Sequence, residues 1–187
     1  MDIFSGSEIM INNIESLFNE NKPVLNFQTR DYYLTKTFTL SQFKKVQKSQ
    51  SISNLIHFQR KNKLLFMAYN EPVMRKMGQL TANPKHLSLE EIINKYEKYL
   101  NQIFQKYPTP GSNINVLIHA FGHISNNLST EEKQFFLNII EKYRNDIISL
   151  SIPKNILYSW ITKFDNDYLI DQTFFNPYPE ELVKLFL

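Results

Sequence analysis

Apolar residues recur at three- and four-residue intervals along most of the chain after residue 30, which is the spacing of the buried face of an α-helix. Leu34 and Phe38 show this spacing in one stretch, and Leu55 and Phe58 show it in the next. No stretch alternates apolar and polar residues between turn signals, as a half-buried strand would. The pattern predicts an all-α fold, a single-domain bundle of seven or eight helices with short connections.

Capping and breaking residues set the expected helix ends. Ser88 with Glu91, and Ser129 with Glu132, have the spacing of a capping box, and Pro72 suits the first turn of a new helix. The expected helices cover residues 31–48, a segment from Ser51 or Ser53 to Tyr69, 71–82, 92–107, a segment from Ser112 or Asn113 to Ile124, 131–150 and 153–164, with a last turn or two capped by Asp167. Residues 1–28 are expected to form an acidic N-terminal extension, and residues 29–187 the helical domain.

Composition removes several classes of protein. Hydrophobic residues make up 42% of the 187 residues and aromatic residues 14%, so the chain can bury a core. The absence of cysteine excludes disulfides, thiolate zinc sites, iron–sulfur clusters and cysteine nucleophiles on this chain. There is no glycine-rich phosphate loop, and no run approaches the roughly 18 apolar residues of a membrane span. We expect a cytoplasmic protein with no cofactor and no membrane association.

Charge is unevenly distributed along the chain. Residues 1–28 carry one basic and four acidic residues (−3), residues 29–86 eleven basic and two acidic (+9), and residues 87–187 nine basic and twelve acidic (−3), which sum to the net charge of +3. A concentrated positive field attracts polyanions. The alternative is an ordinary solvated surface in a lysine-rich chain, since 17 of the 21 basic residues are Lys. The first interpretation predicts nucleic-acid contacts from Lys44, Lys45, Lys48, Arg60, Lys61, Lys63, Arg75 and Lys76.

A line of polar residues follows the otherwise apolar segment 113–124. Asn115 and His119 lie four residues apart, and Gly122 follows three residues later, so the three share one face of the expected helix. They could contact a ligand or a base, with Gly122 allowing a close approach. They could equally satisfy buried backbone groups where two helices meet. His119 and His123 have the spacing of a helical metal pair, but no carboxylate completes a site, so we expect no metal and nominate no catalytic residue.

Several stretches, taken in order, resemble the YbgA-type bacterial domain of unknown function. They are FQRKNKLLFMA (58–68), RKMG (75–78), NVLIHAFG (115–122), Tyr143-Arg144, Tyr168-Leu169 with Gln172, and NPYP (176–179), and the match covers about residues 29–182. That domain occurs alone and also fused behind a TudS-type thiouracil desulfidase domain. The chain departs from the pattern at Gln59, where His is usual, at Lys61, where Arg is usual, and at Asp146, where Gly is usual.

The resemblance implies a helical domain that works beside an enzyme acting on thiolated uracil in tRNA. Because the desulfidase chemistry uses cysteine-held iron–sulfur clusters, a cysteine-free chain is expected to be a non-catalytic, tRNA-binding accessory domain, with a desulfidase as a possible protein partner. Two alternatives remain open. One is a small-molecule or nucleotide-binding enzyme, with a closed pocket around Asn115 and His119 and an Arg or Lys of segment 58–68. The other is an adaptor that docks to a protein through an exposed apolar patch.

Two local roles are also expected. Arg144 could bind a phosphate, but a structural role is expected, either as an ion pair with Glu141 or at a helix C-terminus. Tyr168, Gln172 and residues 176–179 are expected to form a C-terminal clasp folded back on the helices.

Overall fold

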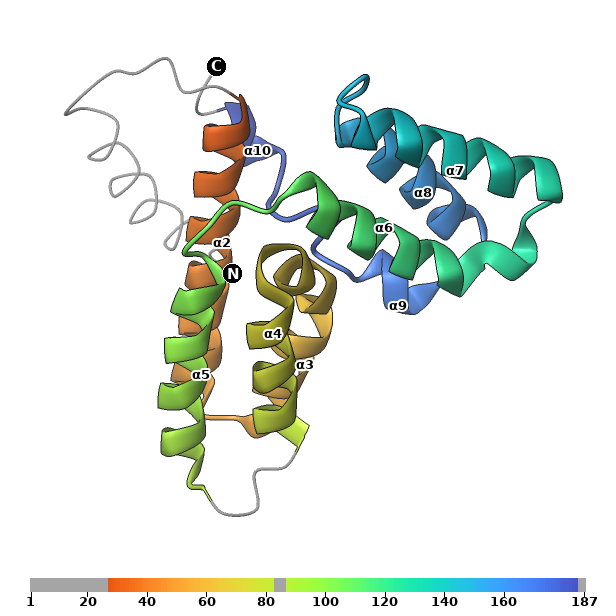
Figure 1. Cartoon of the computed structure of the whole chain (residues 1–187). Helices are drawn as coiled ribbons and strands as arrows, with labels where there is room; N and C mark the ends of the chain where they lie inside the picture. The colour runs from red at the N-terminus through yellow and green to blue at the C-terminus, as the bar shows by residue number, and fades with distance from the viewer. Residues whose placement is uncertain (1–26, 83–86, 185–187) are drawn as a thin grey trace. The chain divides into compact units, whose positions relative to one another are not determined.

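A computed structural model describes residues 27–82 and 87–184 (Figure 1). Every regular element in these ranges is a helix, which confirms the all-α fold. The expected N-terminal extension falls almost wholly outside the described residues. The described chain forms two compact units, one made of residues 27–51 with 177–184 and the other of residues 52–176.

The first unit contains α2 (Phe27–Ser49) and the single turn α10 (Glu181–Lys184). On α2, Leu34 and Phe43 are buried. The Tyr178 hydroxyl donates a hydrogen bond to the Asp31 carboxylate of α2, so residues 177–184 are tied to this helix. Burial, followed by the hydrogen bond and charge of Asp31, raises the pKa of Tyr178. This contact confirms the part of the expected clasp that residues 176–179 supply.

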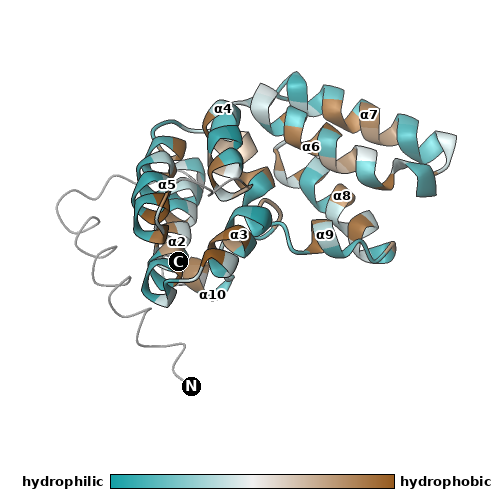
Figure 2. Cartoon of the chain, turned by 90° about the horizontal axis from the view of Figure 1, so that it is seen from below, coloured by the Kyte–Doolittle hydropathy of each residue, from teal (hydrophilic) through white to brown (hydrophobic). Residues whose placement is uncertain are grey.

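The second unit contains α3 (Ile52–Lys61), α4 (Lys63–Ala82), α5 (Leu89–Ile103), α6 (Pro110–Ile124), the 3-10 turn η1 (Ser125–Asn127), α7 (Thr130–Arg144), α8 (Ser151–Lys163) and the single turn α9 (Asp167–Ile170). Helix α4 packs against α3, α5 and α6, while α6 also packs against α7 and α8. Each helix carries both hydrophobic and hydrophilic positions (Figure 2). Burial of the apolar positions between neighbours is the main favourable contribution to folding.

Aromatic side chains fill much of this core. Phe58 of α3 contacts Phe66 of α4 and Tyr96 of α5, with ring centroids 6.0 and 6.2 Å apart. Phe121 of α6 stacks on Phe136 of α7 at 4.9 Å. These contacts join neighbouring helices along the chain and, through Phe58 and Tyr96, also join α3 to α5.

Some helix starts agree with the sequence prediction and others differ. Both expected capping boxes form, at Ser88 and Ser129. A third capping box, formed by Thr109 and Ser112, starts α6 at Pro110, whereas the sequence predicts the start at Ser112 or Asn113. Proline suits this first helical position. Helix α8 begins at Ser151, before Pro153, and Asn166 caps α9 in place of Asp167.

Left-handed residues follow the ends of α7 and α8, and α7 ends earlier than expected. Asp146 has φ 58°, and α7 ends at Arg144 although the apolar pattern runs on to residue 150. Asp165, with φ 53°, follows the end of α8. Because a residue in the left-handed region after the last turn stops a helix, Asp146 occupies a position for which glycine is the easiest residue.

Helix α4 has a kink at Asn70, where φ is −160° and ψ is 87°. The Asn70 side-chain oxygen accepts a hydrogen bond from the Val73 N–H at 3.2 Å, which is the contact of an N-cap. The second part of α4 therefore starts at Glu71 and Pro72, as the sequence predicts. The kink places Glu71 at the start of a helical segment.

Candidate functional site

An open pocket of about 490 Å³ lies among α3, α4 and α6 of the second unit. Its buried lining residues are Gln59, Met67 and Met74. Its exposed lining residues are Arg60, Lys63, Arg75, Gln79 and His119, and the half-buried residues Glu71 and Gly78 complete the wall. The pocket thus has a buried floor rich in thioether and amide groups and a rim rich in cations.

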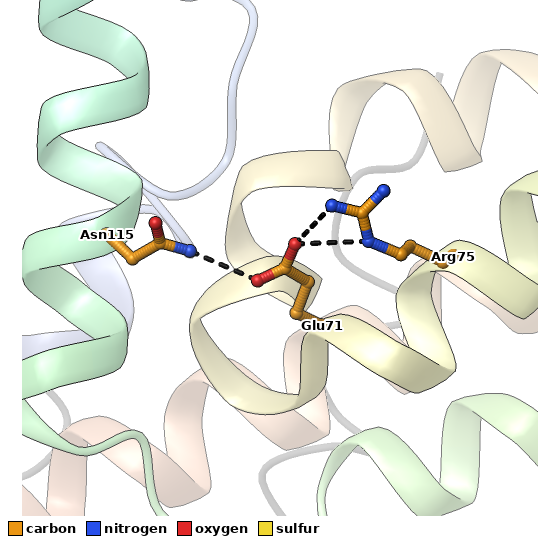
Figure 3. Close-up of polar contacts among 3 residues, drawn as sticks. All are labelled: Glu71, Arg75 and Asn115. Carbon is orange, nitrogen blue, oxygen red and sulfur yellow. Dashed lines mark hydrogen bonds and ion pairs between the residues drawn. The ribbon is translucent and has the colours of Figure 1, made fainter.

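Glu71 organises one side of the rim, as Figure 3 shows. Its Oε1 accepts hydrogen bonds from Arg75 Nη2 at 2.6 Å and Nε at 3.1 Å, and its Oε2 accepts one from Asn115 Nδ2 at 3.1 Å. The start of a helical segment favours a carboxylate, because the backbone N–H groups there are unpaired. One carboxylate therefore holds a cation of α4 and an amide of α6 in fixed orientations.

The turn between α3 and α4 lies between Arg60, near the end of α3, and Lys63, the first residue of α4, and Gln172 holds this turn. The Gln172 side chain is 2% exposed; its Oε1 accepts from the Leu64 N–H at 3.1 Å, and its Nε2 donates to the Arg60 carbonyl at 2.9 Å. Thr173 N–H also donates to the Lys61 carbonyl at 3.1 Å. These bonds confirm the part of the expected clasp around Gln172.

His119 lies at the rim beside His123, with ring centroids 5.3 Å apart. Burial, then the positive charges of His123 and Lys63, lower the pKa of His119 below its usual value of 6.5, and Glu71 opposes them. The neutral imidazole is therefore favoured at neutral pH. His123 in turn contacts the Tyr168 ring at 5.3 Å. Within the part of the chain that the structure describes, no three His, Asp or Glu side chains gather as metal ligands.

The structure brings together only some of the residues predicted from the sequence. Arg60, Lys63, Arg75 and His119 line one pocket, and Asn115 joins them through Glu71. Lys61 is exposed at the end of α3 but is not among the pocket's lining residues. The remaining predicted residues, Lys76 and the group Lys44, Lys45 and Lys48, lie elsewhere.

Lys76 borders a second open pocket of about 590 Å³, which includes Lys95 of α5 and shares Gln79 with the first. Lys44, Lys45 and Lys48 are exposed on α2, in the other unit.

Two expectations about α6 need correction. Asn115 and His119 are exposed, so they do not satisfy buried groups at a tight helix contact. A Cβ placed on Gly122 would meet no other described atom within 4 Å, so no backbone of the described chain approaches it. The ligand contact predicted for Gly122 stays a prediction. The pocket beside His119 is open, unlike the closed pocket that the enzyme alternative expects.

Glu71, Gln59 and the two methionines of the floor line the pocket but are not among the site residues predicted from the sequence. The four-residue spacing of Glu71 and Arg75 is the signal that was available, because such pairs face each other on a helix. Gln59 gave no such signal, since its partner Tyr96 is on another helix. The expected pair of Arg144 with Glu141 is present at 3.4 Å.

The fold and the pocket define an all-α protein with an open, cation-rimmed pocket. The chain belongs to the family described as a protein of unknown function (DUF1722), whose model matches residues 63–179. It is also similar to the uncharacterized protein YbgA of Escherichia coli strain K12, with 24% identity over 126 residues that cover 67% of this chain and 75% of that protein. These findings confirm the YbgA-type resemblance.

No solved structure matches the chain. Among the described helices, none is both long and apolar enough to cross a membrane.

Proposed function

We propose that this chain is a non-catalytic RNA-binding module that holds a phosphate group at the rim of the pocket. The observation that supports the proposal is the meeting of Arg60, Lys63 and Arg75, from α3 and both parts of α4, around one opening. Among the described lining residues Glu71 is the one carboxylate, so three cations against one anion leave a local charge of +2 with His119 neutral. Such a surface attracts phosphates.

An open pocket suits a polymer better than an enclosed cavity would. The rim cations are exposed, so a strand can reach them without first opening the helices. The resemblance to a domain fused to thiouracil desulfidases makes tRNA the first RNA to test, and a desulfidase the first protein partner. The absence of cysteine supports an accessory role, because the chain lacks thiolate ligands for an iron–sulfur cluster.

The experiment is fluorescence anisotropy of the full chain with thiolated and unthiolated tRNA across a salt series. We expect affinity to fall steeply with salt, because each neutralised phosphate releases counterions. The Arg60→Glu/Lys63→Glu variant is expected to bind more weakly and with a smaller salt slope. The matched control, Lys98→Glu/Lys142→Glu, makes the same change of charge at exposed lysines outside both pockets and is expected to bind like wild type.

A triple reversal at Lys44, Lys45 and Lys48 tests the first unit separately, and weaker binding there is also expected. No binding by wild-type protein at low salt would overturn the proposal. Equal loss in the control and the pocket variant would overturn the pocket as the site.

His119 supports a second candidate, a nucleotide-binding enzyme. Its lowered pKa favours a neutral imidazole that can accept a proton at the rim of the open pocket. Uridine 5′-monophosphate binding as tightly as a uridine oligonucleotide would favour this candidate over RNA. Conversely, affinity that rises with oligonucleotide length would favour the RNA module.

A further inference from the structure

The pocket floor contains a hydrogen-bond donor that the described part of the chain does not use. Gln59 of α3 is 7% exposed and lines the pocket. Its Oε1 accepts a hydrogen bond from the Tyr96 hydroxyl at 2.6 Å. No described residue accepts a hydrogen bond from its Nε2, and because every buried side-chain N or O atom among the described residues has a partner, this nitrogen is reached by solvent in the open pocket. An amide donor that is fixed on a largely buried side chain and faces an open pocket is available to a ligand, which would replace the water there.

Tyr96 fixes which end of the amide faces the pocket. The tyrosine is fully buried on α5, and burial raises the pKa of its hydroxyl, so the group stays protonated and can donate. Because Tyr96 occupies the carbonyl end of the amide, the NH₂ end lies toward Gly78. A Cβ added to Gly78 would be 3.9 Å from Nε2. Gln59 therefore offers the pocket donors and no acceptor.

Gly78 is the second unusual feature of the floor. It lies inside α4, and none of the described glycines has a positive φ, so the backbone there does not require glycine. A Cβ would meet only Gln59 Nε2, at ordinary contact distance, so packing does not require glycine either. Glycine lowers helix stability relative to alanine. The missing side chain instead keeps space open beside the Gln59 donor.

We propose that Gln59 and Gly78 receive the carbonyl edge of a nucleobase, so that the ligand is a nucleotide unit such as uridine phosphate. The inference rests on the proposed function and extends it from phosphate to base. The buried thioethers of Met67 and Met74 line the same floor and suit the apolar face of a ring. Adenine fits less well, because a glutamine amide that binds adenine N6 and N7 must accept a hydrogen bond as well as donate one, and the Gln59 oxygen is occupied by Tyr96.

The test is calorimetric binding of uridine 5′-monophosphate, adenosine 5′-monophosphate, ribose 5-phosphate and inorganic phosphate to the full chain. We expect uridine 5′-monophosphate to bind about tenfold more tightly than ribose 5-phosphate or adenosine 5′-monophosphate, the size of one good hydrogen bond with its packing. Equal binding of all phosphates in wild type would overturn the inference and leave the proposed function standing. Absence of binding by every probe would overturn the inference, whereas the anisotropy assay with tRNA decides the proposed function separately.

Two variants separate ligand recognition from folding. Gly78→Ala is expected to raise the urea midpoint of unfolding, because alanine favours the helix. The same variant is expected to bind uridine 5′-monophosphate about tenfold more weakly, because the added methyl group fills the space beside the Gln59 donor. The matched control Gly111→Ala, at an exposed position in the first turn of α6, leaves that affinity unchanged. Unchanged affinity in Gly78→Ala would count against the proposed floor.

The second variant, Gln59→Met/Tyr96→Phe, replaces both hydrogen-bonding partners by apolar groups of similar shape, which preserves folding better than removing one of them. It is expected to bind ribose 5-phosphate like wild type but to lose the preference for the uridine nucleotide. A preference that survives this double change would show that Gln59 does not read the base.

Discussion

The Gln172→Leu variant tests whether the C-terminal clasp holds the turn between α3 and α4, which lies between Arg60 and Lys63. Leucine has a similar volume but neither accepts nor donates a hydrogen bond. In the variant, the Leu64 N–H loses its acceptor and the Arg60 carbonyl loses its donor. The Leu64 contact is buried, so water cannot readily replace it.

The size of the effect follows from these groups. A net hydrogen bond is worth about 1 kcal/mol, and a buried group left unpaired costs about 1–3 kcal/mol. We therefore expect Gln172→Leu to lower the free energy of unfolding by about 2–4 kcal/mol, with the larger part from the Leu64 N–H. Affinity for RNA should fall as well, because the rim cations lose their fixed turn.

Urea unfolding followed by tryptophan fluorescence measures this directly. Trp160 is the single tryptophan of the chain, and it lies on α8 of the second unit, where its ring contacts Phe136 at 5.7 Å. The control Gln134→Leu removes an exposed bond to Asn138 and is expected to change stability by less than about 0.5 kcal/mol. If Gln172→Leu unfolds at the same urea concentration as Gln134→Leu, the clasp does not hold the turn.

Two further predictions concern a helix cap and a histidine. Ser129→Ala removes the side-chain cap of α7 and is expected to lower the free energy of unfolding in urea by about 1 kcal/mol. An unchanged free energy would mean that the hydrogen bond from the residue 129 N–H to Glu132 is sufficient. Because the folded state lowers the pKa of His119, the unfolded chain binds a proton first as pH falls, so stability should decrease below pH 6.5. The decrease should be smaller in His119→Gln, and identical pH profiles would contradict the assigned environment.

The local features of the fold could be predicted because their causes are local. Capping boxes at Ser88 and Ser129 depend on residues three positions apart, and both form. The end of α7 was missed because apolar residues continue past Arg144, while the left-handed Asp146 stops the helix. A single backbone conformation there overrides the periodic pattern.

The site was only partly predictable because it depends on contacts between distant segments. The sequence marks Arg60, Lys63, Arg75 and His119 as separate candidates, and only the packing of α4 on α3 and α6 brings them to one pocket. Glu71 seemed an isolated acid in a basic segment, yet it orients Arg75 and Asn115.

The most direct test of the central claim is a two-dimensional amide NMR titration of the chain with a short uridine-rich RNA. The four glycines give few and separable signals, so Gly78 in the pocket and Gly111 outside it serve as paired reporters. We predict that the Gly78 signal and those of the turn between α3 and α4 shift on binding while the Gly111 signal stays in place. Shifts confined to other parts of the chain, or no shifts at low salt, would contradict the account.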